Sequence, residues 1–187
     1  SRADLLKKSC VPFISIPANV QESDIKKQCL SQKKTIQQTT LLLSCEKAKK
    51  ISSLYPDFLI LAADQILEFD ARWFDKPLCL VEAKERLQLL RGKTHKLVNG
   101  VVCIKGGVEV WSYNNTVKLF MRNFTDDFID FYIQQDGRSL LSSVGAYKIE
   151  GFGAQLFSRI SGDYFSILGL PILPLFEYLR KEGFLQT

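Results

Sequence analysis

The chain has 187 residues, 46% hydrophobic and 24% charged, which suits one soluble globular domain, and its net charge of +5 is too small to diagnose nucleic-acid binding. Five widely spaced cysteines without a Cys-x-x-Cys pair, and a single histidine, argue against a disulfide framework and a zinc site. Because no apolar run could span a bilayer and no signal peptide is visible, we expect a cytoplasmic protein.

The first third of the chain predicts two helices separated by a short extended run. Residues 1–8 have helical spacing, and because the chain begins without Met we expect a further segment before Ser1. Residues 11–17 form a β-type run between prolines, and the polar residues after them predict a loop that carries Glu22. A helix is expected over 35–54, on which Lys47 interrupts an apolar border. That lysine either snorkels to solvent or projects into a cleft.

The stretch from Phe58 to Pro77 predicts the strand around which the chain is organised. No charge interrupts Phe58 to Ala63, and the apolar run ends in Asp64, as expected of a buried strand that places one carboxylate at its end. The alternative interpretation is that Asp64 only caps a turn after a core strand. The strand pattern alone does not decide between these two interpretations.

The rest of the chain alternates helices and strands. A two-residue turn at Gly106-Gly107 requires an antiparallel pair, so we predict an α/β protein with a mixed β-sheet flanked by helices. The expected elements are a helix from Leu80 to Gly92, a strand over 96–104, a strand over 108–122 broken near Asn114-Asn115, a helix from Thr125 to Gly137 and a helix over 171–180.

The common nucleotide and metal motifs are missing from the sequence: it has no phosphate loop, no dinucleotide fingerprint and no His-Glu-x-x-His. What remains is a dispersed set of carboxylates and cations near predicted strand ends and loops. Such a set indicates no more than an anion-binding α/β domain.

Short blocks along nearly the whole chain nevertheless keep the order and approximate spacing of one known family. They are Arg2-x-x-Leu5-Leu6, Asn19-Val20-Gln21-Glu22, Glu46-Lys47-Ala48, Ala63-Asp64-Gln65, Asp75-Lys76-Pro77, Arg91-Gly92-Lys93-Thr94-His95-x-x-x-x-Gly100, Gly145-Ala-Tyr-Lys148-Ile-Glu150-Gly151, and Gly162-Asp163-Tyr164 through Gly169-Leu170-Pro171. Each block is weak alone, but jointly they are specific. In these blocks the chain resembles the Maf family, the septum-formation-protein-like nucleoside triphosphate pyrophosphatases.

The resemblance implies a reaction and a set of residues for it. The reaction is hydrolysis of a nucleoside triphosphate to the monophosphate and pyrophosphate with a divalent cation, normally Mg²⁺, with Mn²⁺ or Co²⁺ as alternatives. Asp64 matches the proton acceptor, and Glu22 with Asp64 would form the metal environment. Arg2, Lys47 and Lys76 would hold phosphate oxygens. The mechanism does not require His95, which we interpret as structural.

The resemblance also implies the fold and the choice of nucleobase. It implies one Maf/ITPase-like, two-lobed domain over residues 1–187 with a long central cleft. Three positions would set specificity: Ser1, Gln65 and Glu150. The last two match members that prefer 7-methyl-GTP, and a glutamate can accept hydrogen bonds from the guanine N1–H and amino group. Ser1 departs from that pattern and from the pattern of dTTP/UTP pyrophosphatases. If the protein is an enzyme of this family, a dTTP/UTP pyrophosphatase stays the alternative.

The expected partner is a small-molecule nucleotide, with no stable nucleic acid and no membrane, and the resemblance implies a homodimer. Two other classes stay open: a non-catalytic nucleotide- or nucleic-acid-binding protein, and an interaction protein whose charges are solvated. Asp64 with Glu22 discriminates among them, because a pure phosphate binder has no use for carboxylates beside the anion unless a metal bridges them.

Overall fold

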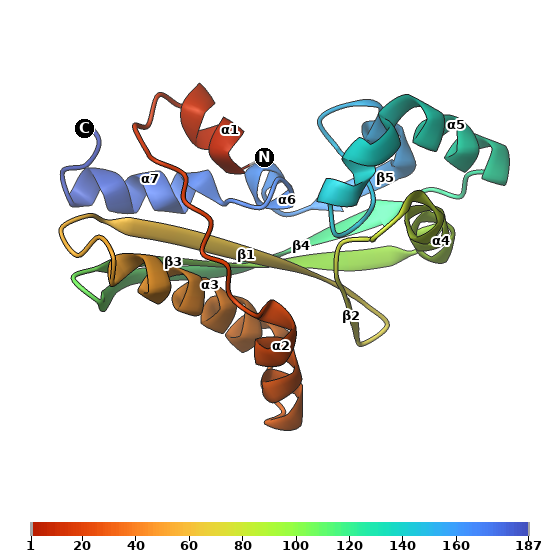
Figure 1. The fold of residues 1–187 in the computed structure, drawn as a ribbon. Helices are drawn as coiled ribbons and strands as arrows, with labels where there is room; N and C mark the ends of the chain where they lie inside the picture. Colours follow the sequence, from red (N-terminus) through yellow and green to blue (C-terminus); the bar gives the residue numbers. More distant parts are fainter. Residues whose placement is uncertain (1, 187) are drawn as a thin grey trace. The chain divides into compact units, whose positions relative to one another are not determined.

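A computed structural model of the chain describes residues 2–186, in which five strands form one sheet in the order β2-β1-β3-β4-β5 (Figure 1). No helix in this range is long and apolar enough to cross a membrane. The elements are α1 (Arg2–Lys8), α2 (Glu22–Ser31), α3 (Ile36–Ser52), β1 (Ile60–Phe69), β2 (Arg72–Phe74), α4 (Leu80–Leu90), β3 (Thr94–Lys105), β4 (Val108–Met121), α5 (Asp126–Asp136), the 3-10 helices η1 (Gly137–Ser142) and η2 (Phe152–Leu156), β5 (Phe157–Ser161), α6 (Tyr164–Ile167) and α7 (Ile172–Lys181).

The predicted α/β class, a sheet flanked by helices, is confirmed. Both outer strand pairs are antiparallel, with Leu67 opposite Phe74 in β1–β2 and Lys118 opposite Ser161 in β4–β5. The turn between β3 and β4 falls at Gly106-Gly107, as predicted. Both glycines have positive φ, 55° and 78°, a conformation that side chains with a Cβ rarely adopt.

The chain divides into two compact units. Unit 1 contains residues 1–65, 98–115 and 163–187, and unit 2 contains residues 66–97 and 116–162. The three long strands β1, β3 and β4 each contribute residues to both units. The expectation that residues 1–187 form a single domain stays a prediction.

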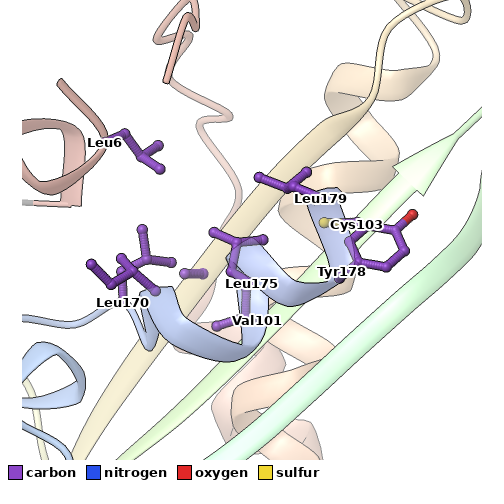
Figure 2. Close-up of a cluster of buried hydrophobic side chains, with 9 residues drawn as sticks. Leu6, Val101, Cys103, Leu170, Leu175, Tyr178 and Leu179 are labelled. Atoms are coloured by element: carbon purple, nitrogen blue, oxygen red, sulfur yellow. The ribbon is translucent and has the colours of Figure 1, made fainter. Parts of the chain in front are cut away.

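The core of unit 1 is built on both faces of its part of the sheet. Figure 2 shows Leu175 and Tyr178 of α7 beside Val101 and Cys103 of β3, within a larger buried cluster. The alternate β3 residues Val102 and Ile104 belong to a second buried cluster, which also contains Ala48 of α3. Because neighbouring strand residues point to opposite faces, α7 and α3 cover opposite faces of the sheet (Figure 1). Burial on both faces explains why β3 reads as an almost continuous apolar run.

Helix α3 is fixed at its start and at its middle. Thr35 and Gln38 form a capping box, in which the Gln38 N–H donates to Thr35 Oγ1 at 3.2 Å and the Thr35 N–H donates to Gln38 Oε1 at 2.9 Å. Further along, Ser44 donates to the Gly100 carbonyl at 2.8 Å. A Cβ at Gly100 would lie 2.5 Å from the Thr40 carbonyl carbon, so only glycine lets β3 approach α3 this closely.

Unit 2 contains α4, α5 and a buried histidine. As predicted, Thr125 is the N-cap of α5, where it accepts a hydrogen bond from the Phe128 N–H at 3.2 Å, and Gly137 with φ 53° follows the helix. His95 is 1% exposed, and its Nε2 lies 2.7 Å from the Tyr147 hydroxyl. Burial lowers the pKa of His95 to about 4, so the ring is neutral at pH 7, in keeping with a structural role.

Three local predictions are wrong. Residues 11–17 form no strand in the described chain, because Pro12 and Pro17 lack an N–H for a ladder and Ile14 stays 79% exposed. β4 runs unbroken through Asn114 and Asn115, whose side chains make hydrogen bonds without interrupting the strand. Residues 22–24, which were expected in a loop, begin α2 instead. The sequence carries little sign of this helix, because only Cys29 in it is buried and its apolar periodicity is weak.

Candidate active site

Asp64 lies within β1 rather than at its end. The strand continues to Phe69, and Ile66 and Leu67, which follow the Asp64-Gln65 pair, are 1% and 0% exposed. The prediction that the strand ends at Asp64 is therefore wrong, because the apolar run resumes after one polar pair. The alternative that Asp64 caps a turn is also wrong. Since Asp64 is itself only 5% exposed, its carboxylate requires a partner.

Lys47 of α3 supplies that partner and joins a second carboxylate to it. Its Nζ lies 2.5 Å from Asp64 Oδ1 and 2.7 Å from Glu22 Oε1. The side chains of Lys47 and Asp64 are 17% and 7% exposed, whereas that of Glu22 is 43% exposed. Lys47 therefore does not snorkel to solvent but bridges two carboxylates. Glu22 does not lie in the predicted loop but in the first turn of α2. At that end of a helix the dipole favours a negative charge.

The second oxygen of Asp64 is a free acceptor beside this bridge. Asp64 Oδ2 is buried and makes no hydrogen bond with residues 2–186. With Glu22 it offers the carboxylate oxygens that a hard divalent cation prefers, so the residues present fit a Mg²⁺ ion. Within the same range no three His, Cys, Asp or Glu side chains gather to hold a metal alone. Mg²⁺ is commonly held by one or two carboxylates together with substrate phosphates.

Arg2 adds a second cation to the bridge. From the first turn of α1 its Nε donates to the Gly169 carbonyl at 2.8 Å and its NH1 donates to the Ala63 carbonyl at 2.7 Å. Gly169 has φ +92°, and a Cβ there would lie 3.2 Å from Arg2 Nε. Burial lowers the pKa of Arg2, but Asp64 and Glu22 act in the opposite direction and favour the charged guanidinium.

Both cations also line a cavity in unit 1. It has a volume of about 770 Å³ and is otherwise mainly apolar, with Phe13, Phe58 and Leu61 in its wall. This size falls in the range of pockets that hold small molecules. A guanidinium and an ammonium in an apolar wall are suited to anionic groups, because the low local dielectric strengthens their attraction.

Gln65 points to the face of β1 opposite to Asp64, as neighbouring strand residues do. Its Nε2 donates to the Ser166 carbonyl at 2.9 Å, to Asn99 Oδ1 at 3.0 Å and to the Ile167 carbonyl at 3.3 Å. The structure thus assigns Gln65 a set of partners in β3 and α6. Its predicted place beside the base or ribose stays a prediction.

Lys76 belongs to unit 2 and lies exposed between β2 and α4. The start of α4 fixes the loop that carries it. The Leu78 N–H donates to Glu82 Oε2 at 2.8 Å, and Arg86 NH1 donates to the Asp75 carbonyl at 3.1 Å. Arg86 therefore holds the residue directly before Lys76. The phosphate-binding role of Lys76 stays a prediction.

Of the other two predicted specificity residues, the structure describes only Glu150. Glu150 is exposed in unit 2, between the turn that ends η1 and the start of η2. Ser1 lies outside the described residues. Of the predicted site residues, the structure therefore gathers Arg2, Glu22, Lys47 and Asp64 in unit 1.

The sequence interpretation missed Asn99 and Asn115, which extend the contacts of Gln65. Asn99 Nδ2 donates to Asn115 Oδ1 at 3.2 Å, and Asn115 Nδ2 donates to Ser166 Oγ at 2.6 Å. One signal could have identified Asn99, because it is a polar residue inside an apolar strand run and is 0% exposed. Asn115 was interpreted as a strand break, and its sequence neighbours give no sign of its contacts.

Two carboxylates joined by a lysine, beside an arginine, thus form a charged cluster in unit 1 that combines carboxylate oxygens with cations suited to anionic groups. Sequence comparison identifies the family: the family model described as Maf-like protein matches residues 1–182. The chain therefore belongs to the Maf family, and it is an enzyme, a hydrolase, of that family.

Several relatives carry the name nucleoside triphosphate pyrophosphatase. The protein from Granulibacter bethesdensis is 44% identical over 182 residues, which cover 97% of this chain and 92% of the relative. The one from Hyphomonas neptunium is 42% identical over 187 residues, covering 100% and 94%. The one from Paramagnetospirillum magneticum is 40% identical over 183 residues, covering 98% and 94%.

Proposed function

We propose that this protein hydrolyses a nucleoside triphosphate to the nucleoside monophosphate and pyrophosphate. One observation carries the proposal: Lys47 joins the buried Asp64 to Glu22 at 2.5 and 2.7 Å, beside Arg2. A carboxylate that can accept a proton thus lies next to cations that can bind phosphate. The shared name of the relatives supports the same reaction.

In the proposed reaction, a water oxygen attacks the α-phosphorus and Asp64 accepts the proton that the water loses. The bond between the α-phosphorus and the bridging oxygen breaks, and pyrophosphate leaves with the electron pair. Lys47 and Arg2 hold the phosphate oxygens and neutralise the charge that develops on them. A positioned base such as Asp64 contributes about 10²–10⁴-fold to a rate.

Glu22 and Asp64 are the residues that would hold a divalent cation, Mg²⁺ first, with Mn²⁺ or Co²⁺ as alternatives. The free Oδ2 of Asp64 and the half-exposed carboxylate of Glu22 support this assignment. When bound, such an ion neutralises phosphate charge and helps to orient the leaving group. Lys76 would add a further cation for the phosphates.

For the nucleobase we propose a purine, in particular 7-methyl-GTP, with dTTP or UTP as the alternative. Gln65 and Glu150 carry this choice. A carboxylate at Glu150 accepts from the guanine N1–H and amino group and repels the O2 and O4 acceptors of a pyrimidine. Glu150→Gln is expected to weaken the preference for guanine over uracil. An unchanged ratio of kcat/KM values would remove this argument for Glu150.

We also propose that the protein is a cytoplasmic homodimer that handles small-molecule nucleotides rather than stable nucleic acid. The dimer follows from the family resemblance. Sedimentation velocity at micromolar concentration tests it, and a mass of one chain at every concentration would contradict it.

The reaction is tested with a panel of canonical and modified triphosphates in the presence of Mg²⁺. Monophosphate and pyrophosphate are quantified for the intact chain, for Asp64→Asn and for the control Asp57→Asn. Asp57 is an exposed acidic residue of the turn before the same strand. We expect turnover in the intact chain and the control, and loss of at least about 100-fold in Asp64→Asn. Nucleotide binding without turnover would favour the non-catalytic alternative.

A further inference from the structure

A chain of hydrogen-bonded side chains runs behind Gln65 in unit 1. It passes from Gln65 through Asn99 and Asn115 to Ser166 and ends at Asp163, which also caps α6. The successive distances are 3.0, 3.2, 2.6 and 2.5 Å. Asn99 and Ser166 are both 0% exposed, so these polar groups depend on one another for partners.

The direction of this chain is fixed by its two ends. The carbonyls of Ser166 and Ile167 can only accept, so the Gln65 amide must turn its nitrogen toward them, at 2.9 and 3.3 Å. At the far end, Asp163 Oδ2 accepts both the Ser166 hydroxyl at 2.5 Å and the Ser166 N–H at 2.8 Å. Every side chain between these ends therefore donates onward toward the Asp163 carboxylate.

The Gln65 amide is left with one group to offer. Its nitrogen has two protons and faces three acceptors, so both protons are used within the protein. Its Oε1 receives no hydrogen bond from residues 2–186. This oxygen is also not one of the buried side-chain atoms without a partner in that range, so it is not sealed from solvent. Gln65 thus presents an acceptor only, although a free glutamine side chain could present either a donor or an acceptor.

We propose that Asn99, Asn115, Ser166 and Asp163 are positioning residues that hold Gln65 as a pure acceptor for a hydrogen-bond donor on the substrate base. This inference rests on the proposed function and narrows its substrate class to bases with adjacent donors, such as the N1–H and amino group of guanine. If this series of side-chain hydrogen bonds is broken, Asn99 is no longer held with its Oδ1 toward Gln65, and only the Ser166 and Ile167 carbonyls keep the Gln65 nitrogen in place, so the amide presents its nitrogen to the base more often. The site then loses its discrimination against bases that lack the donor.

The test uses GTP and ITP, which differ by one amino group. The intact protein is compared with Ser166→Ala, which removes the hydroxyl but keeps the hydrogen bonds that the Phe165 and Ser166 N–H groups donate to the Asp163 carboxylate. Asn115→Ala breaks the series of hydrogen bonds between Asn99 and Ser166. Ser166→Thr keeps a hydroxyl at position 166. The matched control is Asn114→Ala, because Asn114 is the neighbour of Asn115 but donates to Thr40 Oγ1 and the Gln37 carbonyl.

We expect the ratio of kcat/KM values for GTP over ITP to fall about tenfold in Ser166→Ala and Asn115→Ala, mainly through KM for GTP. The ratio should stay near that of the intact chain in Ser166→Thr and Asn114→Ala. If the intact chain hydrolyses both nucleotides and no variant changes the ratio, the inference is overturned while the proposed function stands. If the intact chain hydrolyses no triphosphate, the proposed function itself fails.

A second measurement needs no nucleotide. In an amide NMR spectrum, the side-chain NH2 of Gln65, assigned by its loss in Gln65→Glu, is expected to exchange slowly with water in the intact chain. Exchange should accelerate in Ser166→Ala and Asn115→Ala but not in Asn114→Ala. Fast exchange in the intact chain would contradict a locked amide, whatever the activity. Circular dichroism and urea unfolding confirm that each variant is folded.

Discussion

The bridge from Lys47 to Asp64 predicts a strong coupling between the two side chains. Replacing Lys47 with Met leaves a carboxylate that is 7% exposed without its cation, and removing one partner of a buried pair costs about 3–5 kcal/mol. Asp64→Asn removes the negative charge from the strand but keeps Lys47 in place, and we expect the free energy of unfolding to fall by about 1–3 kcal/mol. The double variant lacks both the Lys47 and the Asp64 charge. Its loss of unfolding free energy should therefore be smaller, by about 2 kcal/mol, than the sum of the losses in the two single variants.

This double-mutant cycle is measured by urea unfolding at pH 7.5 for the intact chain, both single variants and the double variant. The matched control is Lys49→Met on the same helix, because Lys49 makes an exposed ion pair with Glu46 at 3.6 Å. That pair is worth about 0.5 kcal/mol or less. If the losses in the two single variants sum to the loss in the double variant within about 0.5 kcal/mol, Lys47 and Asp64 are not coupled. That result would refute the reasoning about a buried ion pair.

Three further variants test parts of the fold that support the site. In Gly100→Ala the new Cβ would meet the α3 backbone at 2.5 Å, so we expect a loss of about 3 kcal/mol in urea unfolding and reduced turnover, because α3 carries Lys47. The pKa of His95 is about 4 in the folded protein and higher when unfolded, so the unfolded state binds the extra proton as pH falls. Stability should therefore decline from pH 6.5 to pH 4 by about 3 kcal/mol, seen in urea melts, and His95→Gln should remove this part of the decline. Arg86→Met should raise KM for the triphosphate about fivefold in steady-state kinetics, because Arg86 holds the loop before Lys76 through the Asp75 carbonyl at 3.1 Å.

Each of these variants has a control and a result that would contradict it. For Gly100 the control is Gly106→Ala, whose Cβ would meet nothing within 4 Å and whose φ of +55° costs only about 1–2 kcal/mol. Equal losses at both glycines would count against the close packing of α3. An unchanged pH dependence in His95→Gln would show that the histidine is not buried neutral. Arg138→Met is the exposed arginine control in unit 2, and an equal rise in KM there would remove the specific role of Arg86.

The sequence predicted the elements that have strong local signals. One helix starts at Thr35, where its start was predicted, and another follows the predicted cap Thr125. The glycine turn between β3 and β4 is where its dipeptide indicated. These features depend on residues within four positions of one another. Helix α2 was missed because it buries only Cys29, so its apolar spacing carries little information.

The site was less predictable, because its contacts join residues far apart in the sequence. Asp64 was identified, but its place inside the strand became clear only with the buried residues after it. The bridge from Lys47 to Glu22 depends on how α3 and α2 pack, which no spacing rule gives. The partners of Gln65 come from β3 and α6, and the sequence pattern of each of these segments is explained by its own strand or helix without them.

The proposed reaction requires that Asp64 activate water for attack at the α-phosphorus. The most direct measurement is hydrolysis of GTP in ¹⁸O-labelled water with Mg²⁺, with mass analysis of both products, for the intact chain and for Asp64→Asn at equal protein concentration. We expect one labelled oxygen in the monophosphate, none in pyrophosphate, and a rate at least about 100-fold lower in the variant. Label in the pyrophosphate, or an unchanged rate in Asp64→Asn, would contradict it.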